Sequence, residues 1–406
     1  MNSTFQRLIS EATRLAQGAK VQALTSVPPS ADPGDANLLH RLAAGASNPM
    51  SSPAFQNSMA EATRLMQGGN LQAATAAIQA ALGGAAVPAG SANDANVLDV
   101  EAHEVGRAAP AQNPSDPTVR PGPTGQFVSG SHTEGTAGSR DYKLFIPPAS
   151  FTEPLPLVVM LHGCTQNPDD FAAGTGMNDV ALKRGFYVLY PAQTQHANSS
   201  RCWNWFKHNH QKRGRGEPAL LAGMTKDVIS RYNIDPKRVY VAGLSAGGAM
   251  AAILGDAYPD LFAAVGVHSG LATGSATNVQ TALSVMQTGA APAAVARTTA
   301  SPPTIVFHGD QDATVNPVNG EQVLAASAGA HTPETKRAKS ANGRSYTQRS
   351  YKESGGRVVA EHWAVHGAGH AWSGGSAQGS YTDGSGPDAT EEMLRIFLAN
   401  TLPGKH

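Results

Sequence analysis

The residues Gly243, Ser245 and Gly247 form the pattern Gly-x-Ser-x-Gly, which can expose a serine nucleophile on a tight turn. Residues 238–242 (RVYVA) predict a buried strand before it, and residues 247–254 (GGAMAAIL) predict a helix that begins with small side chains. The glycines are needed in such an elbow because a Cβ at either position would strike the neighbouring backbone. We therefore predict that Ser245 is a catalytic nucleophile.

Candidate partners for this serine follow it in the order acid, then histidine. Residues 303–308 (PTIVFH) predict a strand, and the loop after it carries Asp310 and Asp312. A later strand-like stretch leads into a glycine-rich loop that carries His370. Such a histidine would take the serine proton, and the acid would fix its tautomer. The alternative is that the aspartates cap the next helix and His370 is a surface residue, but the order Ser245, Asp312, His370 favours a triad.

Two backbone N–H groups are candidate donors to an oxyanion. Residues 155–161 (LPLVVML) form a continuous apolar run, which is typical of a central parallel strand, and lead into the loop 162–166 (HGCTQ). In α/β-hydrolases one donor comes from the loop after this strand and the other from the residue after the nucleophile. We assign these two donors to Cys164 and Ala246.

Several motifs taken together are similar to those of one esterase family. They are residues 161–166 (LHGCTQ), 202–206 (CWNWF), 243–248 (GLSAGG), 308–312 (HGDQD) and 369–372 (GHAW). Over residues 126–402 the chain resembles the poly(3-hydroxybutyrate) depolymerase family, specifically the type-1 catalytic domain of short-chain-length polyhydroxyalkanoate depolymerases. The resemblance implies Ser245 as nucleophile, Asp312 rather than Asp310 as acid, and His370 as base. Because related members are feruloyl or acetylxylan esterases, it leaves the substrate open.

Aromatic residues gather at the expected site. Trp203 and Trp205 flank Asn204, and Trp372 follows His370 by two positions. Indole rings offer apolar surface and an N–H to an ester substrate, so we predict that these tryptophans and Asn204 bind substrate. The alternative is core packing, expected for at least one of Trp203 and Trp205, with Asn204 bonded to backbone.

The only two cysteines, Cys164 and Cys202, lie in these same motifs. They are either two buried thiols or a disulfide that braces the oxyanion loop against the tryptophan loop. A cytosolic location argues against a stable bridge, and both interpretations remain open. The cysteines lack the spacing of a metal site, and His162 and His308 are expected to be structural. We expect no metal and no cofactor.

Composition restricts the partners. Lys plus Arg and Asp plus Glu both number 30, so nucleic acid is not an expected partner. No apolar run approaches the roughly 20 residues that span a bilayer. The N-terminus lacks the pattern of a secretion signal, which predicts a cytoplasmic protein. Association with polyester granules stays open, and secretion is the alternative. Only residues 371–406 follow His370, so no polymer-adsorbing domain is expected there, which favours oligomers or amorphous granules as substrate.

The chain divides into three predicted regions. Residues 1–84 contain two related helical units, because residues 5–6 and 11–15 (FQ and EATRL) recur at 55–56 and 61–65. This repeat is either a docking element for a granule or another subunit, or a pair of locally packed amphipathic helices. Residues 85–124 are a predicted flexible linker, rich in Ala, Gly and Pro. Residues 125–404 are the predicted catalytic domain.

The catalytic region predicts an α/β-hydrolase fold. Strands are expected at residues 126–131, 140–146, 155–161, 186–190, 239–242, 263–268, 304–308 and 358–365, with a closing helix at 389–402. The first two strands predict an antiparallel pair, and the rest a mostly parallel sheet with helices on both faces. Residues 271–301 are an insertion that either caps the site or adds a surface helix.

The sequence therefore predicts a serine esterase that works through an acyl-enzyme on poly- or oligo(3-hydroxyalkanoate). One alternative is a feruloyl or acetylxylan esterase. Another is a granule-associated binding protein built on a hydrolase scaffold.

Overall fold

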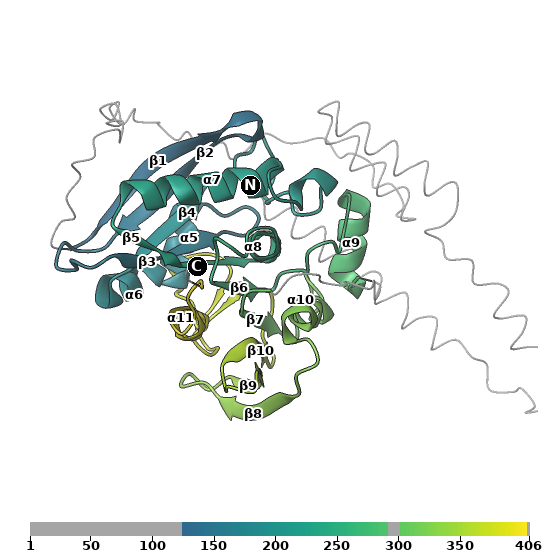
Figure 1. Ribbon diagram of the computed structural model, residues 1–406. Helices are drawn as coiled ribbons and strands as arrows, with labels where there is room; N and C mark the ends of the chain where they lie inside the picture. Colours follow the sequence, from purple (N-terminus) through teal and green to yellow (C-terminus); the bar gives the residue numbers. More distant parts are fainter. Residues whose placement is uncertain (1–123, 291–300, 404–406) are drawn as a thin grey trace, which may run out of the picture. The chain divides into compact units, whose positions relative to one another are not determined.

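The structure is a computed structural model that describes residues 124–290 and 301–403 (Figure 1). The predicted repeat region (1–84) lies outside the described residues, as does the predicted linker (85–124) except for its last residue. The division of the chain into three regions thus stays a prediction.

A ten-stranded sheet forms the centre of the described fold, in the order β1-β2-β4-β3-β5-β6-β7-β10-β9-β8. The strands are β1 (Gln126–Glu134), β2 (Gly138–Ile146), β3 (Leu155–Leu161), β4 (Tyr187–Pro191), β5 (Ile234–Leu244), β6 (Ala264–His268), β7 (Thr304–Gly309), β8 (Pro333–Lys339), β9 (Ser345–Lys352) and β10 (Val358–Val365). Strands β4, β3, β5, β6, β7 and β10 are parallel to their neighbours in this series, and antiparallel pairs close both ends of the sheet. Figure 1 shows β1 and β2 at one end and β8 and β9 at the other.

Helices cover both faces of the sheet because the central strands are apolar on both sides. In β3, Leu157 and Val159 pack in one buried cluster, whereas Val158 and Met160 pack in a second one. The first cluster includes side chains of α7 (Gly216–Arg231), α8 (Ala246–Ala257), α9 (Val279–Thr288) and α10 (Val318–Ala328). The second includes α5 (Pro168–Thr175), α6 (Met177–Arg184) and α11 (Ala389–Leu398). This is the layered arrangement that the sequence predicts.

Two features of the fold differ from the prediction. The hairpin of β8 and β9 was not predicted, because β8 is charged and mostly exposed and so lacks an alternating apolar pattern. The sequence feature that indicates this hairpin is the pair Asn342 and Gly343, which is typical of a turn between two strands. In the structure Gly343 has a φ of 92°. The closing helix ends at Leu398 rather than at residue 402, since Leu402 N leaves the helix to donate to Lys237 O at 2.9 Å.

The insertion between β6 and β7 contains α9. A capping box at Asn278 begins this helix, and Ala282 and Val285 bury one side of it. Asn319 of α10 donates its Nδ2 to Val285 O at 2.9 Å. These contacts agree with the surface-helix interpretation; residues 291–300 of the insertion lie outside the described residues. In the described ranges, no helix has the length and apolar character that a membrane crossing requires.

Candidate active site

Ser245 occupies a strained turn between β5 and α8. Its φ is 59° and its ψ is −119°, a backbone conformation that residues other than glycine rarely adopt. A Cβ added at Gly247 would overlap Leu161 O, and one added at Gly243 would overlap the backbone of Gly247. The two glycines therefore let β5 and α8 approach closely enough to present the Ser245 side chain at the carboxyl end of the sheet.

Asp312 and His370 form an acid–base pair in which Asp312 is buried and His370 is partly buried. His370 Nδ1 lies 2.7 Å from Asp312 Oδ2, and the other carboxylate oxygen accepts from Thr314 N and Val315 N, both at 2.9 Å. Burial raises the pKa of Asp312, but hydrogen bonds from His308 and His370 outweigh burial and hold this pKa well below its usual range. The ionised acid thus fixes the tautomer of His370 that leaves Nε2 free to accept a proton.

The other candidate acid, Asp310, contacts a different histidine. Its Oδ2 lies 2.8 Å from His366 Nδ1, and its Oδ1 accepts from Gly367 N at 2.7 Å. The Asp310 side chain is also more exposed, at 38%. The geometry therefore separates the two aspartates: Asp312 contacts His370, and Asp310 holds the loop that precedes it.

The serine and the histidine come from the same edge of the sheet. Leu244, the last residue of β5, pairs with His268 at the end of β6, and the loop after β7 carries Asp312. Strand β10 is parallel to β7 and ends beside it, where Val365 pairs with Gly309, and it leads into the loop that carries His370. Within residues 124–290 and 301–403, no hydrogen bond joins Ser245 Oγ to His370. In unliganded serine hydrolases this contact is often long and shortens when substrate binds.

The loop after β3 leaves one backbone donor free. Gly163 N donates to Gln166 Oε1 at 2.9 Å and Thr165 N donates to Ser200 O at 2.6 Å, but Cys164 N donates to no atom of the described residues. Ala246 N, in the first turn of α8, likewise has no acceptor there. Because a Cβ on Gly163 would lie 3.6 Å from Ser245 Cβ, this loop borders the serine. The two free donors are those that the sequence assigns to an oxyanion.

A disulfide joins the two cysteines. Cys164 and Cys202 lie 4.2 Å apart at Cα, and no other cysteine is present. The bridge connects the oxyanion loop to the segment that carries the paired tryptophans. Of the two interpretations left open by the sequence, the structure has the disulfide.

The predicted substrate-binding side chains are buried. Trp203 is 0% exposed, Asn204 1%, Trp205 5% and Trp372 1%. Trp203 and Trp205 belong to one apolar cluster, and Trp372 Nε1 donates to Thr390 Oγ1 at 3.1 Å. This burial favours the core-packing interpretation, in which the aromatic residues support the loops of the site from behind.

Besides His308, which contacts Asp312, three buried histidines lie outside the acid–base pair. Burial lowers the pKa of His162 to about 4, and those of His268 and His362 to about 3. His162 Nε2 accepts from Gln193 N at 3.1 Å and His268 Nε2 accepts from Ser373 N at 2.9 Å, which fixes both rings in place. His362 has no hydrogen-bond partner in the part of the chain that the structure describes. All three are neutral at pH 7 and act as structural groups.

We expect the midpoint of thermal unfolding to fall as the pH is lowered from 6.5 toward 4. Unfolded imidazoles bind protons below about pH 6.5 whereas the buried ones stay neutral, so each destabilises the fold by up to about 1.4 kcal/mol per pH unit. The variant His362→Leu removes one such group without breaking a hydrogen bond, so calorimetry across this range should show a shallower slope. Equal slopes for variant and wild type would contradict this prediction.

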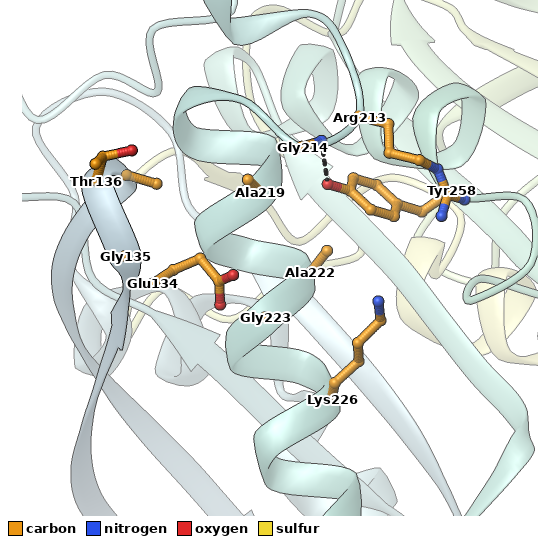
Figure 2. Close-up of a pocket in the computed structure, with 11 residues that line it drawn as sticks. Glu134, Gly135, Thr136, Arg213, Gly214, Ala219, Ala222, Gly223, Lys226 and Tyr258 are labelled. Carbon is orange, nitrogen blue, oxygen red and sulfur yellow. Dashed lines mark hydrogen bonds between the residues drawn. The ribbon is translucent and has the colours of Figure 1, made fainter.

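A surface pocket lies apart from the acid–base pair. It has a volume of about 540 Å³ and lies between the turn after β1 and α7 (Figure 2). Glu134, Thr136, Arg213, Lys226 and Tyr258 supply its polar side chains, and Tyr258 Oη accepts from Gly214 N at 2.9 Å. The pocket lining includes no predicted site residue. Nor do the described residues contain a cluster of His, Cys, Asp or Glu that could hold a metal ion.

The mixed sheet, the serine elbow and the acid–base pair after β7 and β10 define an α/β-hydrolase fold. Comparison with a solved structure agrees: the acetyl xylan esterase of Aspergillus awamori matches with a TM-score of 0.54 at 20% identity, over 67% of this chain and 99% of that one. At this identity the match concerns the fold alone.

Sequence comparison finds related esterases. Residues 140–330 match the family model described as esterase PHB depolymerase. Poly(3-hydroxyalkanoate) depolymerase C of Paucimonas lemoignei is 33% identical over 234 residues, which cover 55% of this chain and 56% of that protein. Feruloyl esterase B of Thermothelomyces thermophilus is 34% identical over 140 residues, which cover 34% of this chain and 47% of that protein. Over these residues the chain is similar to PHB depolymerases and related esterases, and it spans about half the length of these relatives.

Sequence reasoning missed some residues around the site. Glu217 and Gln193 form a buried hydrogen-bonded pair at 2.6 Å behind the tryptophan loop, and His366 contacts Asp310. Glu217 lies in the first turn of a helix, where an acidic residue is expected to face solvent, so nothing in the sequence indicated its burial.

Proposed function

We propose that this protein is a carboxylic-ester hydrolase that cleaves poly- or oligo(3-hydroxyalkanoate), such as poly(3-hydroxybutyrate). The observation that carries the proposal is the contact between His370 and ionised Asp312 at the same sheet edge as the Ser245 elbow. Among common hydrolytic sites, this set of groups suits acyl transfer.

The proposed reaction forms and then hydrolyses an acyl-enzyme. His370 Nε2 takes the proton of Ser245 as its Oγ attacks the ester carbonyl, and the N–H groups of Cys164 and Ala246 donate to the oxyanion. The carbon–oxygen bond to the alcohol breaks, and the alcohol leaves with the proton from His370. Water then attacks the acyl group by the same route, releasing the acid and restoring the serine.

The polyester substrate is supported by the family match and by a relative named for poly(3-hydroxyalkanoate). A second candidate, a feruloyl or acetylxylan ester, is supported by the shorter match to feruloyl esterase B. The family match includes the elbow and the acid but ends before His370, so substrate preference has to be measured directly.

The test compares three substrates. Purified protein is incubated with amorphous poly(3-hydroxybutyrate) granules, methyl ferulate and acetylated xylan, with Ser245→Ala as control. We expect release of 3-hydroxybutyrate from the granules, and none with the variant. Activity on the plant-derived esters alone would reject the polyester and favour the second candidate. Sedimentation of the inactive variant with granules tests granule association in the same samples, and a variant that stays in the supernatant would reject it.

The disulfide supports an oxidising compartment, such as the periplasm or the medium, rather than the cytoplasm that the sequence predicts. Cells that express the protein can be quenched in acid and treated with a thiol-reactive mass tag. We expect the mature protein to carry no tag. Protein with both Cys164 and Cys202 tagged would favour a reducing location.

A further inference from the structure

A buried carboxylate lies behind the tryptophan loop. Glu217, in the first turn of α7, has a side chain that is only 2% exposed. Its two oxygens accept hydrogen bonds from Asn204 N at 2.7 Å, Asn204 Nδ2 at 2.7 Å and Gln193 Nε2 at 2.6 Å. Hydrogen bonds of this length to a carboxylate are strong and directional, so they fix the groups that donate them.

Two routes connect this carboxylate to Cys164. In the first, Asn204 lies two residues after Cys202, whose disulfide holds Cys164. In the second, Gln193 donates from Nε2 to Cys202 O at 3.0 Å and from its backbone N to His162 Nε2 at 3.1 Å. His162 precedes Gly163 and Cys164 in the oxyanion loop. Glu217 therefore holds the oxyanion loop at two points: at Cys164, through the disulfide to Cys202, and at His162, through Gln193.

Glu217 is ionised in this environment. Burial raises its pKa, but hydrogen bonds from His210, Gln193 and Asn204 outweigh burial and hold the pKa below its usual value. Arg140 Nη2, 3.7 Å from Glu217 Oε1, supplies a nearby positive charge. A buried charge with this many donors is costly to disturb, which makes the network rigid.

We propose that Glu217 is a positioning residue for the oxyanion hole: it fixes the backbone N–H of Cys164 through Gln193, Asn204 and the Cys164–Cys202 disulfide. The proposal rests on the proposed ester hydrolysis. An oxyanion donor is effective only if it is already aimed at the charge that develops in the transition state. Loosening the network should therefore slow the acylation step more than it weakens substrate binding.

The test uses Glu217→Gln, which places an NH₂ group among three donors at nearly constant volume. With p-nitrophenyl butyrate as substrate, we expect kcat to fall about tenfold to a hundredfold, somewhat less than the loss of a whole oxyanion donor, while KM stays within about twofold. Inhibition by a butylboronic acid, whose tetrahedral adduct on the serine places an oxygen in the oxyanion hole, should weaken in parallel. The matched control is Asp227→Asn in the same helix, where the carboxylate is 24% exposed and pairs with Arg231.

Active-site titration corrects each kcat for folded enzyme. An unchanged kcat for Glu217→Gln, or a raised KM at constant kcat, would overturn the proposal. If Glu217→Gln does not fold, Asn204→Ala takes its place, since it removes one donor and leaves the carboxylate. This variant should also lower kcat at nearly constant KM, but by a smaller factor. When both fold, the double variant should lose no more activity than Glu217→Gln alone, and additive losses would contradict a shared route.

The outcomes distinguish an error in the proposed substrate from an error in the role proposed for Glu217. If the wild type cleaves p-nitrophenyl butyrate but not polyester, the proposed substrate is wrong and the Glu217 comparison still decides the positioning role. If the wild type cleaves no ester, the proposed function fails and the role of Glu217 in it fails as well.

Discussion

Replacing Ser245 by alanine should lower kcat for ester hydrolysis by about 10⁶-fold, because the variant has no oxygen with which to form the acyl-enzyme. Alanine keeps the Cβ that serine has at a φ of 59°, so the strained elbow and the fold should persist. The measurement is single-turnover and steady-state hydrolysis of p-nitrophenyl butyrate, with thermal unfolding recorded on the same preparations.

Glycine at this position provides a matched control. Ser245→Gly should be equally inactive, but it should raise the free energy of unfolding by about 1 kcal/mol, because glycine accepts a positive φ without strain. If both variants are inactive although their free energies of unfolding differ, the inactivity comes from loss of the nucleophile and not from damage to the fold. An alanine variant that keeps more than a few per cent of wild-type kcat would exclude Ser245 as the nucleophile.

Replacing Asp312 by asparagine should lower kcat by about 10⁴-fold. Asparagine fits the same space, but its amide does not stabilise the imidazolium of His370 and favours the wrong tautomer. The Asp312 carboxylate contacts His370 Nδ1 at 2.7 Å and is also 3.4 Å from His308 Nε2, so its loss leaves two rings without an anionic partner. The measurement is kcat and kcat/KM of the variant and the wild type on p-nitrophenyl butyrate.

The neighbouring aspartate is the control for this prediction. Asp310 contacts His366 and Gly367 rather than His370, so Asp310→Asn should change kcat less than about tenfold. Equal losses in the two variants would contradict the assignment of Asp312 as the acid partner of His370. A larger loss in Asp310→Asn would move that role to Asp310.

Much of the fold could be predicted because the central strands are apolar on both faces. Residues 155–161 form a short continuous apolar run, which is typical of a strand covered on both sides, and β3 occupies those residues. The charged strand β8 has no apolar run of this kind, because it lies at the edge of the sheet and its side chains are mostly exposed. Its position is set by the hydrogen bonds of its pairing with β9.

The candidate site was predictable where chemistry requires a residue type and a backbone shape together. The glycines around Ser245 are necessary for the close approach of β5 and α8, and the order of acid and base follows from the strand order. The role of Glu217 was not predictable, because its burial depends on a loop that folds back over α7. Likewise the tryptophans indicated the region of the site, but only the packing showed them to be buried.

The most direct test of the central claim is to trap the acyl-enzyme. Wild-type protein is mixed with p-nitrophenyl butyrate and quenched in acid within milliseconds, and the mass of the intact chain is then measured and the modified peptide sequenced. We predict one butyryl group per chain, attached to Ser245. A butyryl group on another residue, or a burst of p-nitrophenol with no covalent adduct, would contradict the claim that Ser245 acts as the nucleophile.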